Sequence, residues 1–355
     1  EIQNSPKTIA LLRYFYEEAN DLHVIAAGSL LENILDENIS FPVGRVEFMA
    51  MHPFTFHEFL GAIGEDQSLK LLEQEEVPTY AHDKLSALFK KYTIIGGMPQ
   101  AIVNYADKHD YIALNSVYSS LITSFTEDVE KYARSASMTQ YIHHIISTAF
   151  KEAGTRITFE KFGNSLYRSR EMKEAFTILE KTMLLNLIYP VTSTRLPFSP
   201  DLKKKPRLQL FDTGLVNFSL GTTDDLIAEK YLDNVYRGRI AEHIVGQELI
   251  GATFSVIDTT EFWTREKAES GAELDYVVPY KGMVIPIEVK AGASGRLRSL
   301  HQFINEAPHD WAVRFYSGQF GVEEAITIAR KKYMLINLPY YMAGKLDSVL
   351  VSIIK

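Results

Sequence analysis

Apolar positions recur along the chain with two spacings, one typical of helices and one typical of strands. Near the start, Ile9, Leu12 and Tyr16 repeat every three to four residues, which predicts a helix. Residues 22–27 then form a largely apolar run that ends at Gly28, which predicts a buried parallel strand with a tight exit. A buried strand needs neighbours, so we expect partner strands upstream of Glu1.

The middle of the chain is predominantly helical in pattern. Residues 54–135 carry helix-spaced apolar positions, interrupted by Gly-Gly-Met-Pro at 96–99. Residues 138–190 predict a helix, a turn, a second helix and an extended run. Extended runs at 185–191 and 208–211 flank a polar stretch that contains Lys203, Lys204 and Lys205. Helices followed by a two-stranded hairpin with a basic loop are the outline of a winged helix.

From residue 231 the pattern becomes rich in strands. We expect a helix at about 237–250 and strands at about 253–258, 261–265, 273–279 and 283–290. A helix at about 296–306 and strands at 311–316 and 332–337 follow. Together the segments predict a multidomain α/β protein.

Composition narrows the protein class. The 355 residues are 46% hydrophobic and 23% charged, which is typical of globular proteins and excludes wholesale disorder. Cysteine is absent, so disulfides, thiolate catalysis and Cys-based zinc sites are excluded. No apolar run approaches the ~18–20 residues that span a bilayer, so we expect no membrane partner and a cytoplasmic location. A net charge of −8 argues against a protein coated in nucleic acid.

The pattern richest in candidate chemistry is a predicted hairpin that turns at Lys281 and Gly282. Asp275 lies on its first strand, and Glu288 and Lys290 share one face of its second strand by the two-residue period. An Asp and a Glu on adjacent strands make a hard-oxygen site suited to Mg²⁺. Glu242, on the preceding predicted helix, can add a third carboxylate ligand. A lysine beside such a site can orient a water and stabilise charge on a phosphate.

This order of residues resembles the PD-(D/E)xK nuclease superfamily. Glu242 on a helix, Asp275 on a strand, Glu288-x-Lys290 on the next strand, and then a helix with His301 and Gln302 follow that superfamily's sequence of elements. The resemblance implies a restriction-endonuclease-like domain with Glu242, Asp275 and Glu288 as metal ligands. The strict pattern has Pro before the Asp, whereas Leu274 stands here. Two alternatives stay open: an exposed strand pair, and a nuclease-like fold that has lost useful metal binding.

The first 60 residues resemble a different family, the AAA+ ATPases. Glu1, a helix, and a strand ending at Gly28-Ser29 are similar to the segment from the Walker B glutamate to the sensor 1 strand. The resemblance implies that Glu1 activates the attacking water, that Ser29 contacts nucleotide near the γ-phosphate, and that Arg45 is an arginine finger. The Mg²⁺-binding Asp that precedes the family's glutamate is not part of this sequence. Alternatives are a strand-end turn at Ser29 and a structural ion pair of Arg45 with Glu47 or Glu58.

The whole chain is similar to prokaryotic AAA+-type ATPases that carry a nuclease-like C-terminal domain of unknown function. The resemblance implies an AAA+ core portion with a partial parallel sheet at 1–60, a helical lid at 61–135, a winged-helix-like domain at 136–230 and a nuclease-like domain at 231–355. ATP and Mg²⁺ are the implied cofactors. No Gly-x-x-x-x-Gly-Lys-(Ser/Thr) occurs in the 355 residues, so we expect the phosphate loop upstream and no ATPase activity from this chain alone.

The sequence therefore supports two functional hypotheses. One is an ATPase that acts on nucleic acid, with a Mg²⁺-dependent nuclease as a second activity. The other is a nucleotide-gated binding or scaffold module whose nuclease fold is catalytically dead. DNA or RNA, a protein partner and further copies of the chain are the partners left open. Phosphate contacts are expected at Lys203, Lys204, Lys205, Arg296 and Arg298, although a solvated loop and a plain helix start explain the same residues.

Overall fold

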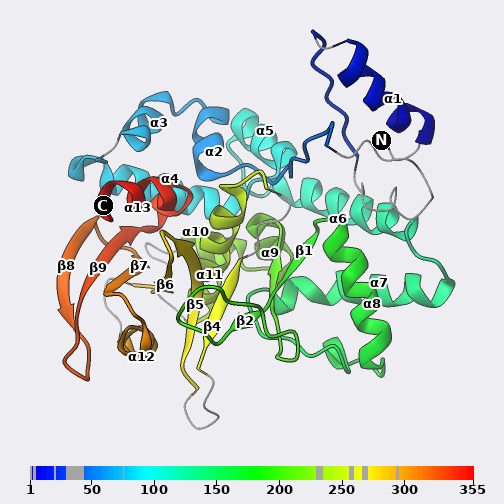
Figure 1. Ribbon diagram of the computed structural model, residues 1–355. Coiled ribbons are helices and arrows are strands. Elements are labelled where there is room, and N and C mark those ends of the chain that lie inside the picture. Colours follow the sequence, from blue (N-terminus) through cyan, green and yellow to red (C-terminus); the bar gives the residue numbers. More distant parts are fainter. Residues whose placement is uncertain are drawn as a thin grey trace.

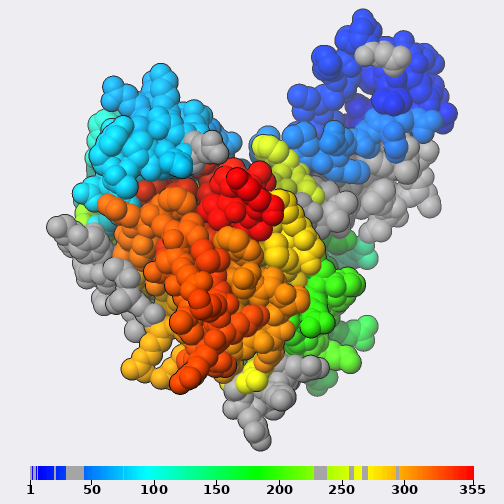
Figure 2. Space-filling model, turned by 60° about the vertical axis from the view of Figure 1, so that its left-hand side comes forward, coloured from blue at the N-terminus to red at the C-terminus, as the bar shows by residue number. Residues whose placement is uncertain are grey.

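The computed structural model describes residues 2, 5–19, 21–28, 44–74, 76–228, 235–255, 260–265, 271–292 and 296–355. The N-terminal helix α1 (Pro6–Glu18) projects from the rest of the protein, as Figures 1 and 2 show. A helical region follows, made of α2 (Phe56–Ala62), α3 (Asp66–Glu73), η3 (Thr79–Ala81), α4 (His82–Ile95), α5 (Pro99–Lys108) and α6 (Leu114–Glu130). Within the described ranges, every helix is too short or too polar to cross a membrane.

The middle of the chain contains the expected helices and hairpin strands. Its helices are α7 (Ala136–Ala149), η4 (Phe150–Glu152), η5 (Phe162–Asn164) and α8 (Ser169–Lys181). Strand β1 (Leu185–Ile188) pairs antiparallel with β3 (Arg207–Leu210), which confirms the predicted pairing of these two runs. Helices α9 (Thr213–Leu220) and α10 (Thr223–Ala228) follow. The run predicted as one strand at 185–191 is divided, because its last residues form β2 (Pro190–Val191) in a different sheet.

That second sheet is a seven-stranded mixed sheet with the order β2-β4-β5-β6-β7-β9-β8. Its later strands are β4 (Glu261–Thr264), β5 (Glu273–Tyr280), β6 (Met283–Val289), β7 (Trp311–Tyr316), β8 (Gly321–Ile326) and β9 (Lys332–Pro339). Strands β5 and β6 form the predicted hairpin, and Lys281 and Gly282 both have positive φ, as a tight hairpin turn requires. β6, β7 and β9 run parallel to one another.

Two helices cover opposite faces of this sheet, as Figure 1 shows: α11 (Val235–Gly251) and α12 (Arg298–Glu306). Alternation along β6 sends Ile285 toward α11 and Val284 toward α12. Both side chains are fully buried, so both faces of the strand belong to the core. The chain ends with η6 (Tyr340–Lys345) and α13 (Leu346–Ile353), which pack on the α11 side.

Three expectations about elements were wrong or incomplete. Residues 22–27 form no strand, and Ile25 is 96% exposed, because no strand among the described residues pairs with this segment. Residues 253–255 are not a strand either, and the rest of that predicted strand lies outside the described residues. The short edge strand β8 and helix α13 were missed, since β8 has few buried positions and therefore little apolar alternation.

Candidate functional site

The residues predicted to bind nucleotide fall mostly outside the described part of the chain. Glu1 and Ser29 lie there. Arg45 is described, and its Nε donates to Glu17 Oε1 of α1 at 2.7 Å, so its ion pair joins it to α1. This pair lines a groove of about 2720 Å³ between the N-terminal segments and the rest of the protein. The ion pair with Glu17 is a structural contact of the kind proposed as the alternative for Arg45, although with a different partner from Glu47 or Glu58.

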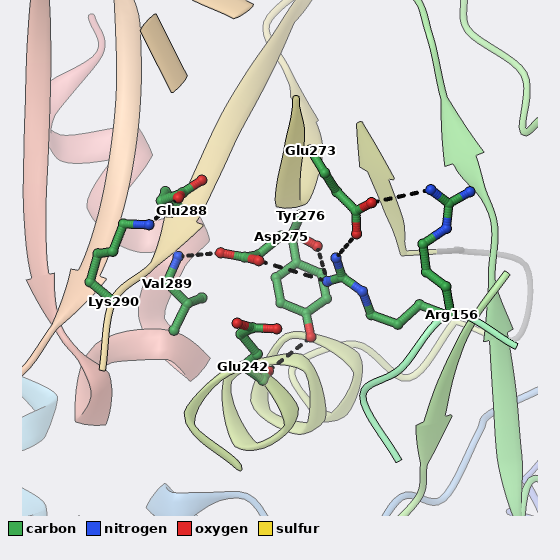
Figure 3. A network of polar contacts seen from close by, with 9 residues as sticks. Arg156, Glu242, Glu273, Asp275, Tyr276, Glu288, Val289 and Lys290 are labelled. Carbon is green, nitrogen blue, oxygen red and sulfur yellow. Dashed lines mark hydrogen bonds and ion pairs between the residues drawn. The ribbon is translucent and has the colours of Figure 1, made fainter. Parts of the chain in front are cut away.

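The predicted acidic residues do come together at one end of the β5–β6 hairpin. The register pairs Tyr276 with Ile287, so the next position places Asp275 beside Glu288. The carboxylate of Asp275 accepts from the backbone N–H of Val289 at 2.7 Å, and Lys290 Nζ contacts Glu288 Oε1. Figure 3 shows Glu242 of α11 approaching Asp275 from the helix side of the hairpin. We call Glu242, Glu273, Asp275 and Glu288 the acidic cluster.

The main cation of the acidic cluster is Arg207, which sequence reasoning missed. Arg207 begins β3 and is only 4% exposed. Its Nη1 donates to the Asp275 carbonyl at 2.9 Å and lies 4.0 Å from Oδ1 of the same residue, while Nη2 donates to Glu273 Oε1 at 2.5 Å. The guanidinium also stacks on Phe262, 4.7 Å from the ring centre. An arginine directly before the apolar run 208–211 was the available hint, because such a side chain needs a buried partner.

A second arginine extends this arrangement toward solvent. Arg156 Nη1 donates to the other carboxylate oxygen of Glu273 at 3.2 Å, and its side chain is one-third exposed. Glu273 therefore bridges one buried and one accessible guanidinium, as the dashed contacts of Figure 3 show. Arg207 and Arg156 both come from outside residues 231–355, so this contact ties the middle of the chain to the sheet.

Burial weakens the acidity of the cluster. Burial, with the charge of Asp275 beside it, raises the pKa of Glu242 to about 8. The same two causes raise the pKa of Glu288 to about 8, although Lys290 opposes them. Burial also raises the pKa of Asp275, against the pull of Arg207. The raised pKa values show that Arg207 and Lys290 offset only part of the cost of burying these carboxylates together.

The expected Mg²⁺ site does not fit this arrangement. Among the described residues, no group of three acidic or histidine side chains is placed to hold a metal ion. Asp275 already accepts from a backbone amide and faces a guanidinium, and one oxygen of Glu288 is held by Lys290. The other oxygen, Glu288 Oε2, is buried without a hydrogen-bond partner, so it is one atom that would suit a cation.

The predicted phosphate-binding residues lie at the surface. Lys203, Lys205, Arg296 and Arg298 are exposed, while Lys204 is half-buried and its Nζ lies 3.4 Å from Thr264 Oγ1. His301 of the nuclease-like pattern contacts the Tyr333 hydroxyl at 3.2 Å and does not contact the acidic cluster in any described interaction. Nothing in these contacts tests nucleic-acid binding, which stays a prediction.

A second buried polar network lies along the other side of α11, and its contacts were not predicted from the sequence. Glu248 Oε1 lies 2.9 Å from the Phe56 backbone nitrogen and 2.8 Å from the Tyr92 hydroxyl. One residue earlier, Gln247 accepts from the Thr213 backbone amide and hydroxyl, both at 2.8 Å. Asp212 caps α9 and also accepts from the Gly97 backbone N–H at 2.6 Å. Burial raises the pKa of Asp212 to about 6.

Comparisons with known families divide the chain into three matched regions. Residues 1–60 match an AAA domain, residues 86–226 match a domain of unknown function (DUF8612), and residues 237–339 match another domain of unknown function (DUF4143). Neither a curated protein nor a solved structure matches the chain. The AAA match supports an AAA-like ATPase, in agreement with the resemblance at the N-terminus.

Proposed function

We propose that this chain belongs to a nucleotide-gated binding module, in which an AAA-type ATP-binding region controls a C-terminal domain that recognises a partner without cutting it. The AAA match at residues 1–60 supports the use of ATP and Mg²⁺ in that region. Glu1, Ser29 and Arg45 are our proposed contributors there, as water activator, nucleotide contact and arginine finger. A winged-helix-like unit at 136–230 and a nuclease-like unit at 231–355 are the proposed fold assignments that go with this function.

One observation carries the choice of binding over cleavage. The Asp275 carboxylate is engaged by the Val289 amide at 2.7 Å and faces the Arg207 guanidinium at 4.0 Å. Metal-assisted cleavage needs ionised carboxylates with free oxygens, and it uses the ion to activate water or to polarise the phosphate. An internal arginine balances the charge of the cluster but does neither of these. The acidic cluster is therefore better suited to joining parts of the protein than to cutting a nucleic acid.

The partner of the C-terminal domain is proposed from surface charge. Lys203, Lys205, Arg296 and Arg298 are exposed cations, and they are the residues expected to contact phosphate if the partner is DNA or RNA. Such binding weakens steeply with salt because counterions are released. A protein partner is the alternative, and its binding would show a shallow salt dependence at these positions.

A Mg²⁺-dependent nuclease is the second candidate function. The unpaired Glu288 Oε2 favours it, together with the order of Asp275, Glu288 and Lys290 along the hairpin. This candidate requires Arg207 to leave the acidic cluster. If the experiment below detects this activity, the nuclease replaces the binding module as the proposed function.

The experiment measures metal binding and cleavage with the full 355-residue chain. Calorimetric titration with Mn²⁺, and incubation with labelled single-stranded, duplex and branched DNA with Mg²⁺ present, are run on the wild type and on Asp275→Ala. Asp310→Ala, at an exposed acid outside the cluster, is the matched control. We expect neither binding at millimolar Mn²⁺ nor cleavage. Binding or cleavage that Asp275→Ala abolishes and Asp310→Ala preserves would establish the nuclease instead.

A further inference from the structure

Glu248 is a buried acid that joins three separate parts of the chain. It lies near the end of α11 and is 2% exposed. Through Oε1 it meets the first backbone amide of α2 at Phe56 and the hydroxyl of Tyr92 on α4. Phe56 belongs to residues 53–58, which lie within the AAA-matching region and which we call the 53–58 segment. Glu248 itself lies in the DUF4143-matching region.

The Phe56 amide donates to Glu248 Oε1, but the Tyr92 hydroxyl cannot serve both an ionised Glu248 and the Phe54 carbonyl. The Tyr92 hydroxyl lies 2.7 Å from the Phe54 carbonyl and 2.8 Å from Glu248 Oε1, and both of these are acceptors if the carboxyl is ionised. A tyrosine hydroxyl has one hydrogen and cannot serve both. Gln247 Nε2 donates to the Tyr92 oxygen at 3.0 Å and so adds no hydrogen toward either acceptor.

A proton on Glu248 resolves this shortage. A carboxylic acid can donate to the Tyr92 oxygen, which leaves the tyrosine hydrogen for the Phe54 carbonyl. Loss of that proton redirects the tyrosine hydrogen to the carboxylate. The Phe54 carbonyl then loses its donor, and a charge is left in the interior.

The surroundings also favour the neutral acid. The charged groups that act on Glu248 or Tyr92 are Glu58 on α2 and Asp212 at the start of α9, and both are acidic. From the η6 side the neighbour is the backbone of Gly344, where an added Cβ would lie 2.9 Å from Glu248 Oε2. Burial, opposed by the bonds from Tyr92 and Phe56, raises the pKa of Glu248 to about 7.

We propose that Glu248 and Tyr92 form a protonation-controlled latch that holds the 53–58 segment of the AAA-matching region against α11. With the carboxyl protonated, Tyr92 bonds to Phe54 and the latch is closed. With the carboxyl ionised, that bond is lost and the segment is held less firmly. The latch goes beyond the proposed function and does not depend on whether the acidic cluster binds a metal.

The sign of the effect follows from the raised pKa. A carboxyl whose pKa is higher in the folded protein stabilises the fold fully below its ordinary value, near 4.5, and this stabilisation is lost as pH rises through about 7. Between these two values the open state releases the proton and the closed state keeps it, so each pH unit favours opening by up to roughly tenfold. The 53–58 segment should therefore open more readily as pH rises from about 4.5 to about 7, and its opening should change little above that.

Amide hydrogen exchange of the 53–58 segment tests the latch in the full chain. After correction for intrinsic rates, wild-type protection should fall by up to roughly tenfold per pH unit between about pH 4.5 and pH 7, and it should level off above pH 7. Glu248→Gln keeps a neutral donor and acceptor at every pH, so its protection should be independent of pH. Asp83→Asn is the matched control, since Asp83 is an exposed acid on α4, the helix that carries Tyr92, and it should retain the wild-type pH dependence.

Two further measurements keep the test decisive if Glu248→Gln does not fold. Tyr92→Phe removes the bond to Phe54 at all pH values, so its segment should already be poorly protected at pH 5.5. The ¹³C resonance of the Glu248 carboxyl in the wild type should titrate close to pH 7. Equal pH dependence in the wild type and Glu248→Gln overturns the latch, as does a Glu248 carboxyl that titrates below pH 5.

Discussion

Replacing Arg207 with Met should lower the free energy of unfolding of the protein by about 3 kcal/mol. The methionine retains a stem that can pack on Phe262 but removes both donors and the charge. The Asp275 carbonyl and Glu273 Oε1 then lose partners at 2.9 and 2.5 Å. Breaking a buried ion pair on one side costs ~3–5 kcal/mol. The lower end applies here because Glu273 is partly exposed and can regain water, and because Asp275 can take up a proton.

Arg156→Met is the matched control for this prediction. Arg156 contacts the same Glu273, but its side chain is one-third exposed, and exposed ion pairs contribute at most ~1 kcal/mol to stability. Urea denaturation followed by tryptophan fluorescence is the assay, because the two tryptophans, Trp263 and Trp311, both lie in the seven-stranded sheet. The midpoint should fall for Arg207→Met with little change in slope. Equal midpoints for the two variants would refute the role of Arg207 as the buried counter-ion.

A double variant separates the charge from the packing. Asp275→Asn added to Arg207→Met removes the carboxylate that the first change leaves unpaired. If electrostatic imbalance causes the loss, the second substitution should recover part of the stability, and the two effects should not be additive. Additive losses would place the cost in packing against Phe262 and not in charge.

Three further predictions concern other parts of the fold. Gly97→Ala should destabilise by ~1–3 kcal/mol in calorimetry, because the new Cβ would lie 2.3 Å from the Phe54 carbonyl oxygen and backbone cannot yield easily. Trp263→Ala should cost ~3–5 kcal/mol by circular dichroism in urea, since the ring is fully buried edge-to-face with Phe303, 5.3 Å away. Glu242→Gln should melt like the wild type near pH 4 and at an increasingly higher temperature than the wild type as pH rises from 4.5 to 8, because the pKa of Glu242 is raised from 4.5 to about 8 in the fold and only the wild type loses stability over that range.

The local sequence pattern was sufficient to predict the β5–β6 hairpin and the acidic residues of the site. The two-residue period and the Lys281-Gly282 turn fix the register, and the register brings Asp275 beside Glu288. The pattern could not supply Arg207, whose contact with Asp275 spans 68 positions and joins two different sheets. Glu248 was hidden for the same reason, since its partner Phe56 is 192 positions away.

The error at residues 22–27 has a different physical cause. An apolar run records that a segment prefers burial, but a strand exists only where a neighbour accepts its backbone hydrogen bonds. In the described structure this segment has one such bond to Ile2, from the Ile2 N–H to the Ala27 carbonyl. Both the predicted burial and the predicted strand were therefore wrong for residues 22–27, which are exposed.

The division of residues 185–191 between two sheets limits where the chain can be divided into separately folding fragments. Strand β2 (Pro190–Val191) pairs with β4, which begins about 70 residues later, at Glu261. A fragment that starts at residue 231 would leave the edge of β4 unpaired and deprive the Trp263 indole of the Thr192 carbonyl, which lies 3.1 Å away. An exposed edge strand with unpaired N–H and C=O groups is a template for pairing with other chains. If the chain is divided into two fragments between residues 192 and 260, each fragment should aggregate when it is expressed alone. The two should fold together when they are co-expressed.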